Sequence, residues 1–259
     1  MSDSLEPRIA PKMLARGLHA SYGSKEALRN VNFSLVDKRV TAIIGPSECG
    51  KSTFVRCLNR THELSEGAAV GGEVLLNGNN IYDRSVDPVS LRRRVGLIAK
   101  RPNVFPTMTV RENVLSGLRL NGIRPTDADE VVEHCLTRVL LWNETKDNLD
   151  QPALSLPVGD QQRVCIARML ALEPDVVLMD EPCAFLDPVA TAKIEDLLRD
   201  LSETCAVLVV THSVHQAARV SDFAAFFLLG ALVEYSDTDT LFTKPRDART
   251  EDYLTGRFG

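Results

Sequence analysis

One short run of residues combines glycines, a basic side chain and hydroxyl groups at a fixed spacing. It fits the pattern G-x-x-x-x-G-K-[ST], in which backbone N–H groups and the positive end of the following helix point at one position. Such a position binds polyphosphate, with Lys51 reaching the terminal phosphates and the Ser52 hydroxyl ligating Mg²⁺. We therefore expect the run to bind a nucleotide. Its members are Gly45, Pro46, Ser47, Glu48, Cys49, Gly50, Lys51, Ser52 and Thr53.

Two adjacent carboxylates, Asp180 and Glu181, follow an apolar run at residues 176–179. The run predicts a buried parallel strand, and ligands of open α/β sheets bind beyond the carboxyl ends of such strands. Because burying two acids is costly unless they serve a cation, we favour a functional pair over a solvated surface pair. We assign Asp180 to holding Mg²⁺ through water and Glu181 to polarising the attacking water.

A third apolar run, residues 206–210, is followed by Thr211, His212 and Ser213. It predicts another buried strand, with Ser213 placed to cap the next helix. Two strand ends suited to phosphate chemistry are already present, so we interpret His212 as a γ-phosphate sensor. The alternative interpretation is a structural histidine. His19, His62, His134 and His215 lack this context and are treated as structural or surface residues.

Strand and helix patterns alternate along the chain and predict an α/β fold. Residues 40–44 predict a buried strand before the glycine-rich run, and we expect the acids to finish the neighbouring core strand. Residues 28–36 alternate apolar and polar side chains, and Asn77-Gly78 predicts a hairpin turn. These two patterns indicate a small antiparallel sheet beside the core. Residues 88–94 predict a short basic helix before a buried strand at 95–99.

Residues 109–141 carry a helical pattern with no alternating strand, which predicts an inserted helical subdomain. We expect a single domain over residues 1–259. Its core comprises about 13–99 and 159–245, and its helical subdomain comprises about 100–158.

Composition excludes several classes of protein. A formal charge of −5 argues against non-specific nucleic-acid binding, so we expect no nucleic-acid partner. Six cysteines without a C-x-x-C pair favour reduced thiols over a disulfide frame or a zinc site. Residues 1–11 lack the apolar core of a signal peptide, and residues 223–233 are too few to span a bilayer. Work at a membrane would then require docking through partners.

The order of these motifs, with the Gln161-Gln162-Arg163 helix between them, resembles ABC-type ATPase subunits. The resemblance runs from about Met13 to the C-terminus. It implies a P-loop NTPase (RecA-like) core with an antiparallel β-subdomain and an inserted helical subdomain. Less generic segments resemble the ATP-binding subunit of the bacterial phosphate-specific importer, and these are residues 101–106, 141–147, 179–188, 217–222 and 251–258.

That resemblance implies ATP and Mg²⁺ as cofactors, with Tyr22 stacking on adenine. It also implies a second ATP-binding subunit, membrane permease subunits and, indirectly, an extracytoplasmic phosphate-binding protein as partners. The location implied is peripheral, at the cytoplasmic face of the cell membrane. Each composite site would combine Lys51, Ser52, Asp180, Glu181 and His212 of one subunit with a signature segment of the other.

The signature segment departs from the family pattern. Family members have Leu-Ser-Gly-Gly-Gln, whereas this chain has Leu156-Pro157-Val158-Gly159-Asp160. Pro157 has neither a hydroxyl nor an N–H, so two phosphate donors are lost. Val158 adds a branched side chain where close backbone approach is expected, and the charge of Asp160 is expected to repel phosphate.

Lys100 stands where the family has a glutamine that ligates Mg²⁺. A protonated lysine has no lone pair for a metal, although it can offer positive charge to the γ-phosphate. Glu48 replaces the usual loop glycine, and we expect binding to survive with an electrostatic penalty. Ala184-Phe185-Leu186-Asp187 varies from the family's Ser-Ala-Leu-Asp but keeps Asp187.

Three functions compete at this point. The first is a transport ATPase that couples ATP binding and hydrolysis to phosphate import, and we favour it. The second is a hydrolysis-impaired regulatory subunit or heterodimer partner, which the altered signature and Lys100 favour. The third is an ABC-type ATPase unrelated to transport, which usually shows tandem domains or a long coiled coil. A small-molecule kinase would not explain the helix at Gln161-Gln162-Arg163 or the strand end at His212.

Overall fold

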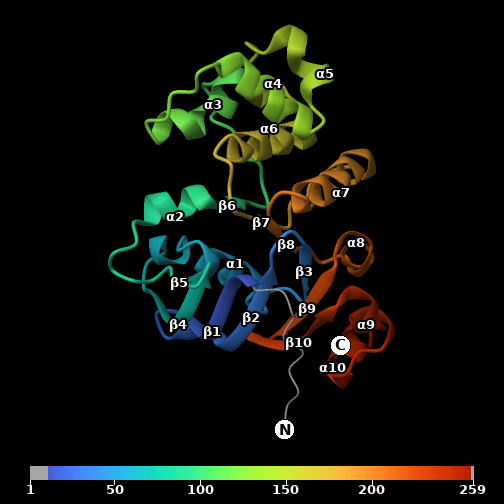
Figure 1. The fold of residues 1–259 in the computed structure, drawn as a ribbon. Coiled ribbons are helices and arrows are strands. Elements are labelled where there is room, and N and C mark those ends of the chain that lie inside the picture. The colour runs from blue at the N-terminus through green and yellow to red at the C-terminus, as the bar shows by residue number, and fades with distance from the viewer. Residues whose placement is uncertain (1–10, 258–259) are drawn as a thin grey trace.

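The computed structural model describes residues 11–257, in which two sheets lie side by side below a layer of helices (Figure 1). This arrangement confirms the expected α/β fold class with an antiparallel subdomain and a helical insertion. Residues 1–10 and Phe258 lie outside the described part, so the expectations placed on them are not addressed by the structure.

The central sheet has six strands in the order β10-β9-β3-β8-β7-β6, and only β10 is antiparallel to its neighbour. Strands β3, β7 and β8 are buried along their whole length, as expected for parallel strands covered on both faces. The bounds are β3 Val40–Ile44, β6 Val95–Ile98, β7 Val176–Asp180, β8 Ala206–Val210, β9 Phe223–Leu228 and β10 Ala231–Asp237.

The second sheet is antiparallel, in the order β2-β1-β4-β5. Asn77 and Gly78 have φ values of 51° and 83° between paired strands β4 and β5, so they form the predicted hairpin turn. The bounds are β1 Pro11–Tyr22, β2 Lys25–Val36, β4 Ala68–Leu76 and β5 Asn79–Asn80.

A helical layer lies above the central sheet (Figure 1). Its first helix, α3, begins with a capping box, in which Thr109 and Glu112 each bond the other's backbone N–H. The bounds are α3 Val110–Leu120, α4 Ala128–Arg138, α5 Trp142–Thr145 and α6 Val158–Leu170, with short 3₁₀ turns η2 Lys146–Asn148 and η3 Ala153–Ser155. Because α6 packs on α3 and α4, we propose that the helical subdomain extends to Leu170 rather than ending near residue 158.

The remaining helices pack around the sheets. Asp87, Asp187 and Ser213 cap three of them with their side chains, and the cap at Ser213 confirms the prediction from the sequence. The bounds are α1 Lys51–Leu58, η1 His62–Leu64, α2 Pro88–Arg94, α7 Pro188–Ser202, α8 Val214–Val220, α9 Thr238–Thr243 and α10 Ala248–Leu254.

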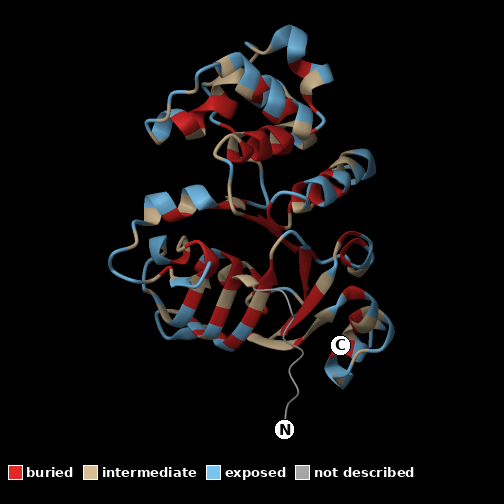
Figure 2. Cartoon of the chain, viewed as in Figure 1, coloured by how far each residue is buried: buried red, intermediate tan, exposed pale blue. Residues whose placement is uncertain are grey.

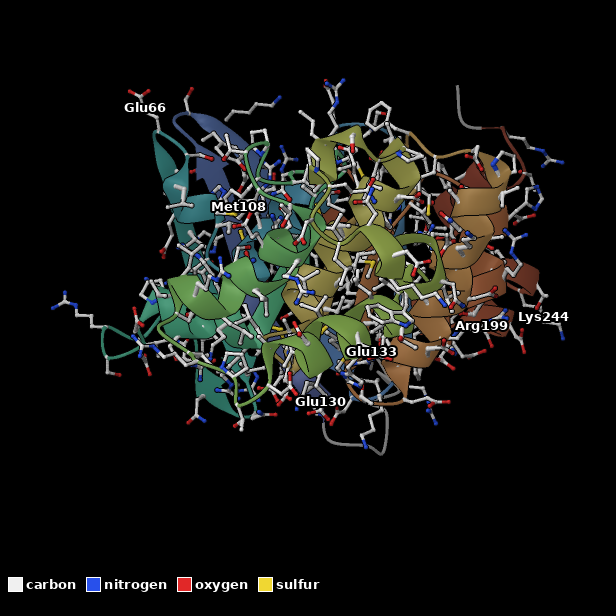
Figure 3. The ribbon with its side chains drawn as sticks, turned by 90° about the horizontal axis from the view of Figure 1, so that it is seen from above. Glu66, Met108, Glu130, Glu133, Arg199 and Lys244 are labelled. Carbon is white, nitrogen blue, oxygen red and sulfur yellow. The ribbon has the colours of Figure 1, made fainter. Side chains whose placement is uncertain are left out.

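The central strands are largely buried (Figure 2), and their alternate residues enter two separate cores, one on each face of the sheet. Ile43, Leu178 and Val210 pack on the face that carries α1, whereas Ile44 and Met179 pack on the other. Charged side chains such as Glu66, Arg199 and Lys244 lie at the periphery (Figure 3). Within residues 11–257, no helix is both long enough and apolar enough to cross a membrane.

Candidate functional site

The glycine-rich loop between β3 and α1 is folded around its own lysine. Lys51 is 4% exposed, and its Nζ donates to the carbonyl oxygens of Gly45 at 2.8 Å and Pro46 at 2.6 Å. Gly45 and Gly50 have φ values of 148° and 103°. A Cβ on Gly45 would lie 2.2 Å from the Phe227 carbonyl oxygen, so the loop requires glycine there.

Glu48 lies at the tip of this loop in a left-handed conformation, with φ of 62°. Residues with a Cβ seldom adopt this conformation, because it brings Cβ close to a carbonyl oxygen. The exposed Glu48 side chain also lines the cavity beside the loop. The tip is therefore strained as well as negatively charged.

Three strand ends meet beside the loop. Thr211 N–H donates to Ile43 O at 3.1 Å, and Glu181 N–H donates to Val210 O at 3.0 Å. From the sequence we expected the acids to finish the strand next to β3. That expectation was wrong, because the acids lie at the end of β7 and β8 lies between β3 and β7. Parallel order nevertheless places all three carboxyl ends at one edge of the sheet.

Asp180 and Ser52 are joined across this edge. Ser52 Oγ donates to Asp180 Oδ1 at 2.9 Å. Asp180 is 8% exposed, and burial raises the pKa of its carboxyl despite the hydrogen bond from Ser52. A buried carboxylate beside a hydroxyl is an oxygen donor set that suits a hard divalent cation such as Mg²⁺.

Glu181 follows Asp180 with a left-handed φ of 50°. Its Oε2 lies 2.5 Å from Lys100 Nζ and its Oε1 lies 2.6 Å from His212 Nε2. Burial raises the pKa of Glu181, but the contacts with Lys100 and His212 outweigh it and lower the pKa overall. The carboxylate is therefore held as an anion.

His212 is positioned by the helix that follows it. Ser213 Oγ accepts a hydrogen bond from Gln216 N–H, and Thr211 Oγ1 donates to Gln216 Oε1 at 2.6 Å. Gln216 in turn donates to Glu195 on α7, which also binds Arg219 through two hydrogen bonds. This network connects α7 and α8 behind His212.

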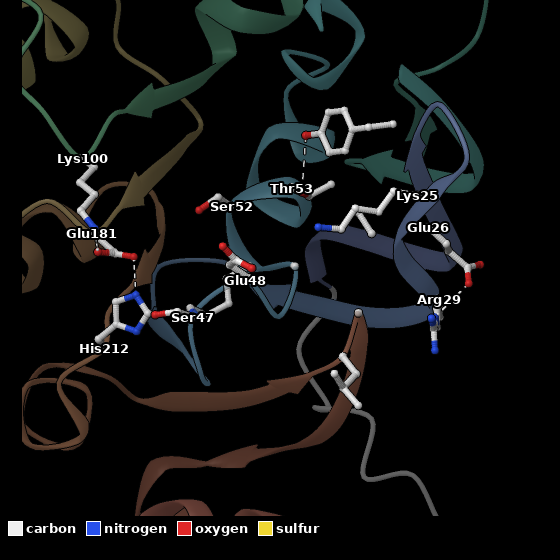
Figure 4. A pocket seen from close by; sticks show the side chains of 16 residues that line it. Lys25, Glu26, Arg29, Ser47, Glu48, Ser52, Thr53, Lys100, Glu181 and His212 are labelled. Atoms are coloured by element: carbon white, nitrogen blue, oxygen red, sulfur yellow. Dashed lines mark hydrogen bonds and ion pairs between the residues drawn. The ribbon is translucent and has the colours of Figure 1, made fainter. Parts of the chain in front are cut away.

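A cavity of about 640 Å³ lies over the loop, and the predicted residues line much of it. Ser47, Glu48, Ser52 and Thr53 lie between two groups of side chains, with Lys100, Glu181 and His212 at one end and Lys25, Glu26 and Arg29 at the other (Figure 4). Gly50, Lys51 and Tyr22 also line it, whereas Gly45, Pro46, Cys49 and Asp180 are not among its lining residues.

The end formed by Lys25, Glu26 and Arg29 was not predicted from the sequence. Arg29 lies 2.9 Å from Glu26 in an ion pair, and all three residues belong to the strand after Tyr22. The sequence signal that could have revealed this end is the run of charged residues that follows Tyr22 and the glycine turn. The Tyr22 hydroxyl lies 3.4 Å from Thr53 Oγ1, and its ring meets the His62 ring edge-on. Its stacking on adenine stays a prediction.

The signature segment lies at the start of α6, and within residues 11–257 none of its members lines this cavity. Pro157 is the N-cap of α6 and makes no side-chain hydrogen bond there. Val158 is exposed, and a Cβ on Gly159 would lie 2.8 Å from Ala190 Cβ on α7. Asp160 Oδ1 lies 2.5 Å from Arg163 Nη2, so its charge is paired within α6, which weakens the repulsion of phosphate expected from the sequence.

Comparison with known proteins gives consistent results. A family model described as "ABC transporter" matches residues 28–184. The chain is 52% identical to the phosphate import ATP-binding protein PstB of Leifsonia xyli subsp. xyli, over 97% of this chain and 100% of that protein. It is also 52% identical to the PstB protein of Koribacter versatilis, over 94% of this chain and 97% of that protein.

Solved structures share the fold. CbiO1 from Clostridium perfringens, described as part of the ABC transporter complex cbiONQ, superposes with a TM-score of 0.78 at 25% identity, covering 96% of this chain and 97% of that chain. A bacterial Atm1-family ABC exporter with ATP bound superposes with a TM-score of 0.79 at 24% identity, over 96% of this chain and 42% of that chain. The second likeness concerns the fold alone.

Proposed function

Because this chain belongs to the ABC transporter family, we propose that it is the ATP-binding subunit of an importer that takes up inorganic phosphate across the cell membrane. The observation that carries this proposal is 52% identity to phosphate import ATP-binding proteins along nearly the whole chain. The cavity supports it, because the loop, Glu181 and the strand-end His212 line one space of about 640 Å³.

We assign the chemistry to residues of the glycine-rich loop and of the strand ends beside it. Lys51, which now bonds carbonyl groups of its own loop, would bind the terminal phosphates of ATP. Ser52 and Asp180 would hold Mg²⁺, which supplies positive charge to the phosphate oxygens when bound. Glu181 would polarise the attacking water, and His212, 2.6 Å from Glu181, would fix the orientation of its carboxylate and sense the γ-phosphate.

We propose that two ATP-binding subunits act together. The signature segment does not line this chain's own cavity, so it remains free for the site of an opposite subunit. Membrane permease subunits and an extracytoplasmic phosphate-binding protein would complete the importer. The chain would then lie peripherally at the cytoplasmic face of the membrane.

A second candidate function rests on Pro157 and Lys100. In a homodimer both sites would carry the altered signature, whereas pairing with an ordinary paralogue would give one active site and one impaired site. The absence of a hydroxyl at the N-cap of α6 and the ion pair on Glu181 favour a subunit that binds ATP but hydrolyses it slowly.

The test is uptake of radiolabelled phosphate by vesicles that contain the chain with the membrane subunits of its importer. We expect uptake that requires ATP and is lost in the Lys51→Ala variant. Sulfate is the matched control anion. Transport of sulfate in place of phosphate would contradict the substrate assignment, and ATP binding without any ATP turnover would favour the second candidate.

A further inference from the structure

Lys100 makes an ion pair, which the uncharged glutamine that the family has at this position cannot form. Its Nζ lies 2.5 Å from Glu181 Oε2, while His212 occupies the other carboxylate oxygen at 2.6 Å. The Glu181 side chain is only 12% exposed, whereas that of Lys100 is 46% exposed, so solvent screens the ion pair from the lysine side only. Both oxygens of the Glu181 carboxylate are therefore engaged.

The backbone on both sides of this ion pair is anchored by one residue of the helical layer. Gln162 Nε2 donates to Ala99 O at 3.0 Å and to Pro182 O at 3.3 Å. Ala99 directly precedes Lys100 and Pro182 directly follows Glu181. Helix α6 therefore fixes both backbone segments, which keeps the ammonium group within reach of the carboxylate.

The same ammonium group adds a positive charge where the phosphates would lie. Lys100 lines the cavity at its Glu181–His212 end, and 46% of its side chain is exposed there (Figure 4). An ammonium group has three donors, and Glu181 Oε2 engages one of them. The other two donors can bind phosphate oxygens, whose negative charge a divalent cation would otherwise neutralise.

We propose that Lys100 is a positioning residue that holds Glu181 in an ion pair and presents a fixed positive charge to the triphosphate. This inference rests on the proposed function. The site then binds metal-free ATP more tightly than a site without Lys100, and its gain in affinity from Mg²⁺ is smaller.

The test compares ATP affinity of the full chain with Mg²⁺ and with EDTA, measured by titration calorimetry. The measured quantity is the ratio of the dissociation constant in EDTA to that in Mg²⁺. Replacing Lys100 by Gln removes the fixed charge and supplies an oxygen that can ligate metal, so we expect this ratio to rise about tenfold. Lys100→Met removes the charge without supplying an oxygen, and we expect weaker binding in EDTA with a smaller rise in the ratio.

Arg101→Gln is the matched control, because it removes a neighbouring cation whose side chain stacks on Phe185 outside the cavity. We expect its ratio to equal that of the unmodified chain. An unchanged ratio in both Lys100 variants would overturn the inference, and so would an equal rise in Arg101→Gln. Absence of ATP binding in every variant and condition would instead contradict the proposed function.

Discussion

Ser52 Oγ donates to Asp180 Oδ1 at 2.9 Å, although a whole strand, β8, separates β3, which leads to Ser52, from β7, which ends at Asp180. The bond joins two of the predicted phosphate-site motifs. It also leaves a buried carboxylate whose pKa burial raises, so the site is destabilised by its own acid.

We expect Asp180→Asn to stabilise the nucleotide-free chain while abolishing its ATPase activity. An amide keeps an acceptor for Ser52 and removes the cost of a buried charge, which should raise the free energy of unfolding by about 1 kcal/mol. Urea unfolding measures the change. Asp87→Asn, at the cap of α2, is the control and should change stability little. A less stable Asp180→Asn chain would argue against this account.

Restoring Pro157→Ser together with Val158→Gly should raise the steady-state ATPase rate by about tenfold or more, because donors to the γ-phosphate are regained. Serine at the N-cap of α6 contributes about 1 kcal/mol, and glycine at 158 costs about the same, so stability should stay nearly constant. Leu154→Ser, at an exposed position shortly before this segment, is the control. Equal rates in all three chains would refute the donor-loss explanation.

Glu48→Gly should tighten ATP binding by about three- to tenfold, because it removes both a negative charge and a left-handed non-glycine backbone. Glu48→Gln removes the charge alone and separates the two causes. Calorimetric titration with ATP measures each effect. If Glu48→Gln matches Glu48→Gly, the backbone strain has no part in binding, and if neither variant binds more tightly the prediction is wrong.

Asp175 should make stability depend on pH at the acid end. Burial raises its pKa, but hydrogen bonds from Arg94 at 2.7 Å and Lys12 at 3.0 Å outweigh burial and lower it. A lowered pKa means that the contribution is complete above the ordinary value near 4 and is lost as the pH falls through the folded-state pKa. Asp175→Asn should therefore be less stable than the unmodified chain at pH 7 and nearly equal to it at pH 2. A difference that persists at pH 2 would exclude this linkage.

Much of the fold follows from local patterns. The buried runs at 40–44, 176–179 and 206–210 are strands because β-branched and apolar residues, with Thr41 as their one polar member, suit a sheet covered on both faces. The turn at Asn77-Gly78 and the capping residue Ser213 likewise act over a few residues. Patterns that span only a few residues can be recognised in a single sequence.

The order of the strands in the sheet cannot be predicted from patterns that span only a few residues. β8 lies between β3 and β7 although it follows both in the chain, so the expectation of adjacent strands for Lys51 and the acids was wrong. The pairing of Asp160 with Arg163 and of Lys100 with Glu181 depends on rotamers and on helix placement. The charged end at Lys25 and Arg29 was likewise missed, because its role depends on which loop lies opposite.

The central place of β8 restricts how this chain can change length over evolution. A one-residue deletion within 206–211 would shift the register that joins Thr211 to Ile43 and Val210 to Glu181. His212 would then turn away from its carboxylate partner. Gaps in alignments of functional relatives should therefore fall in the turn at 203–204, whose residues are exposed, so that added residues extend into solvent without moving the strand.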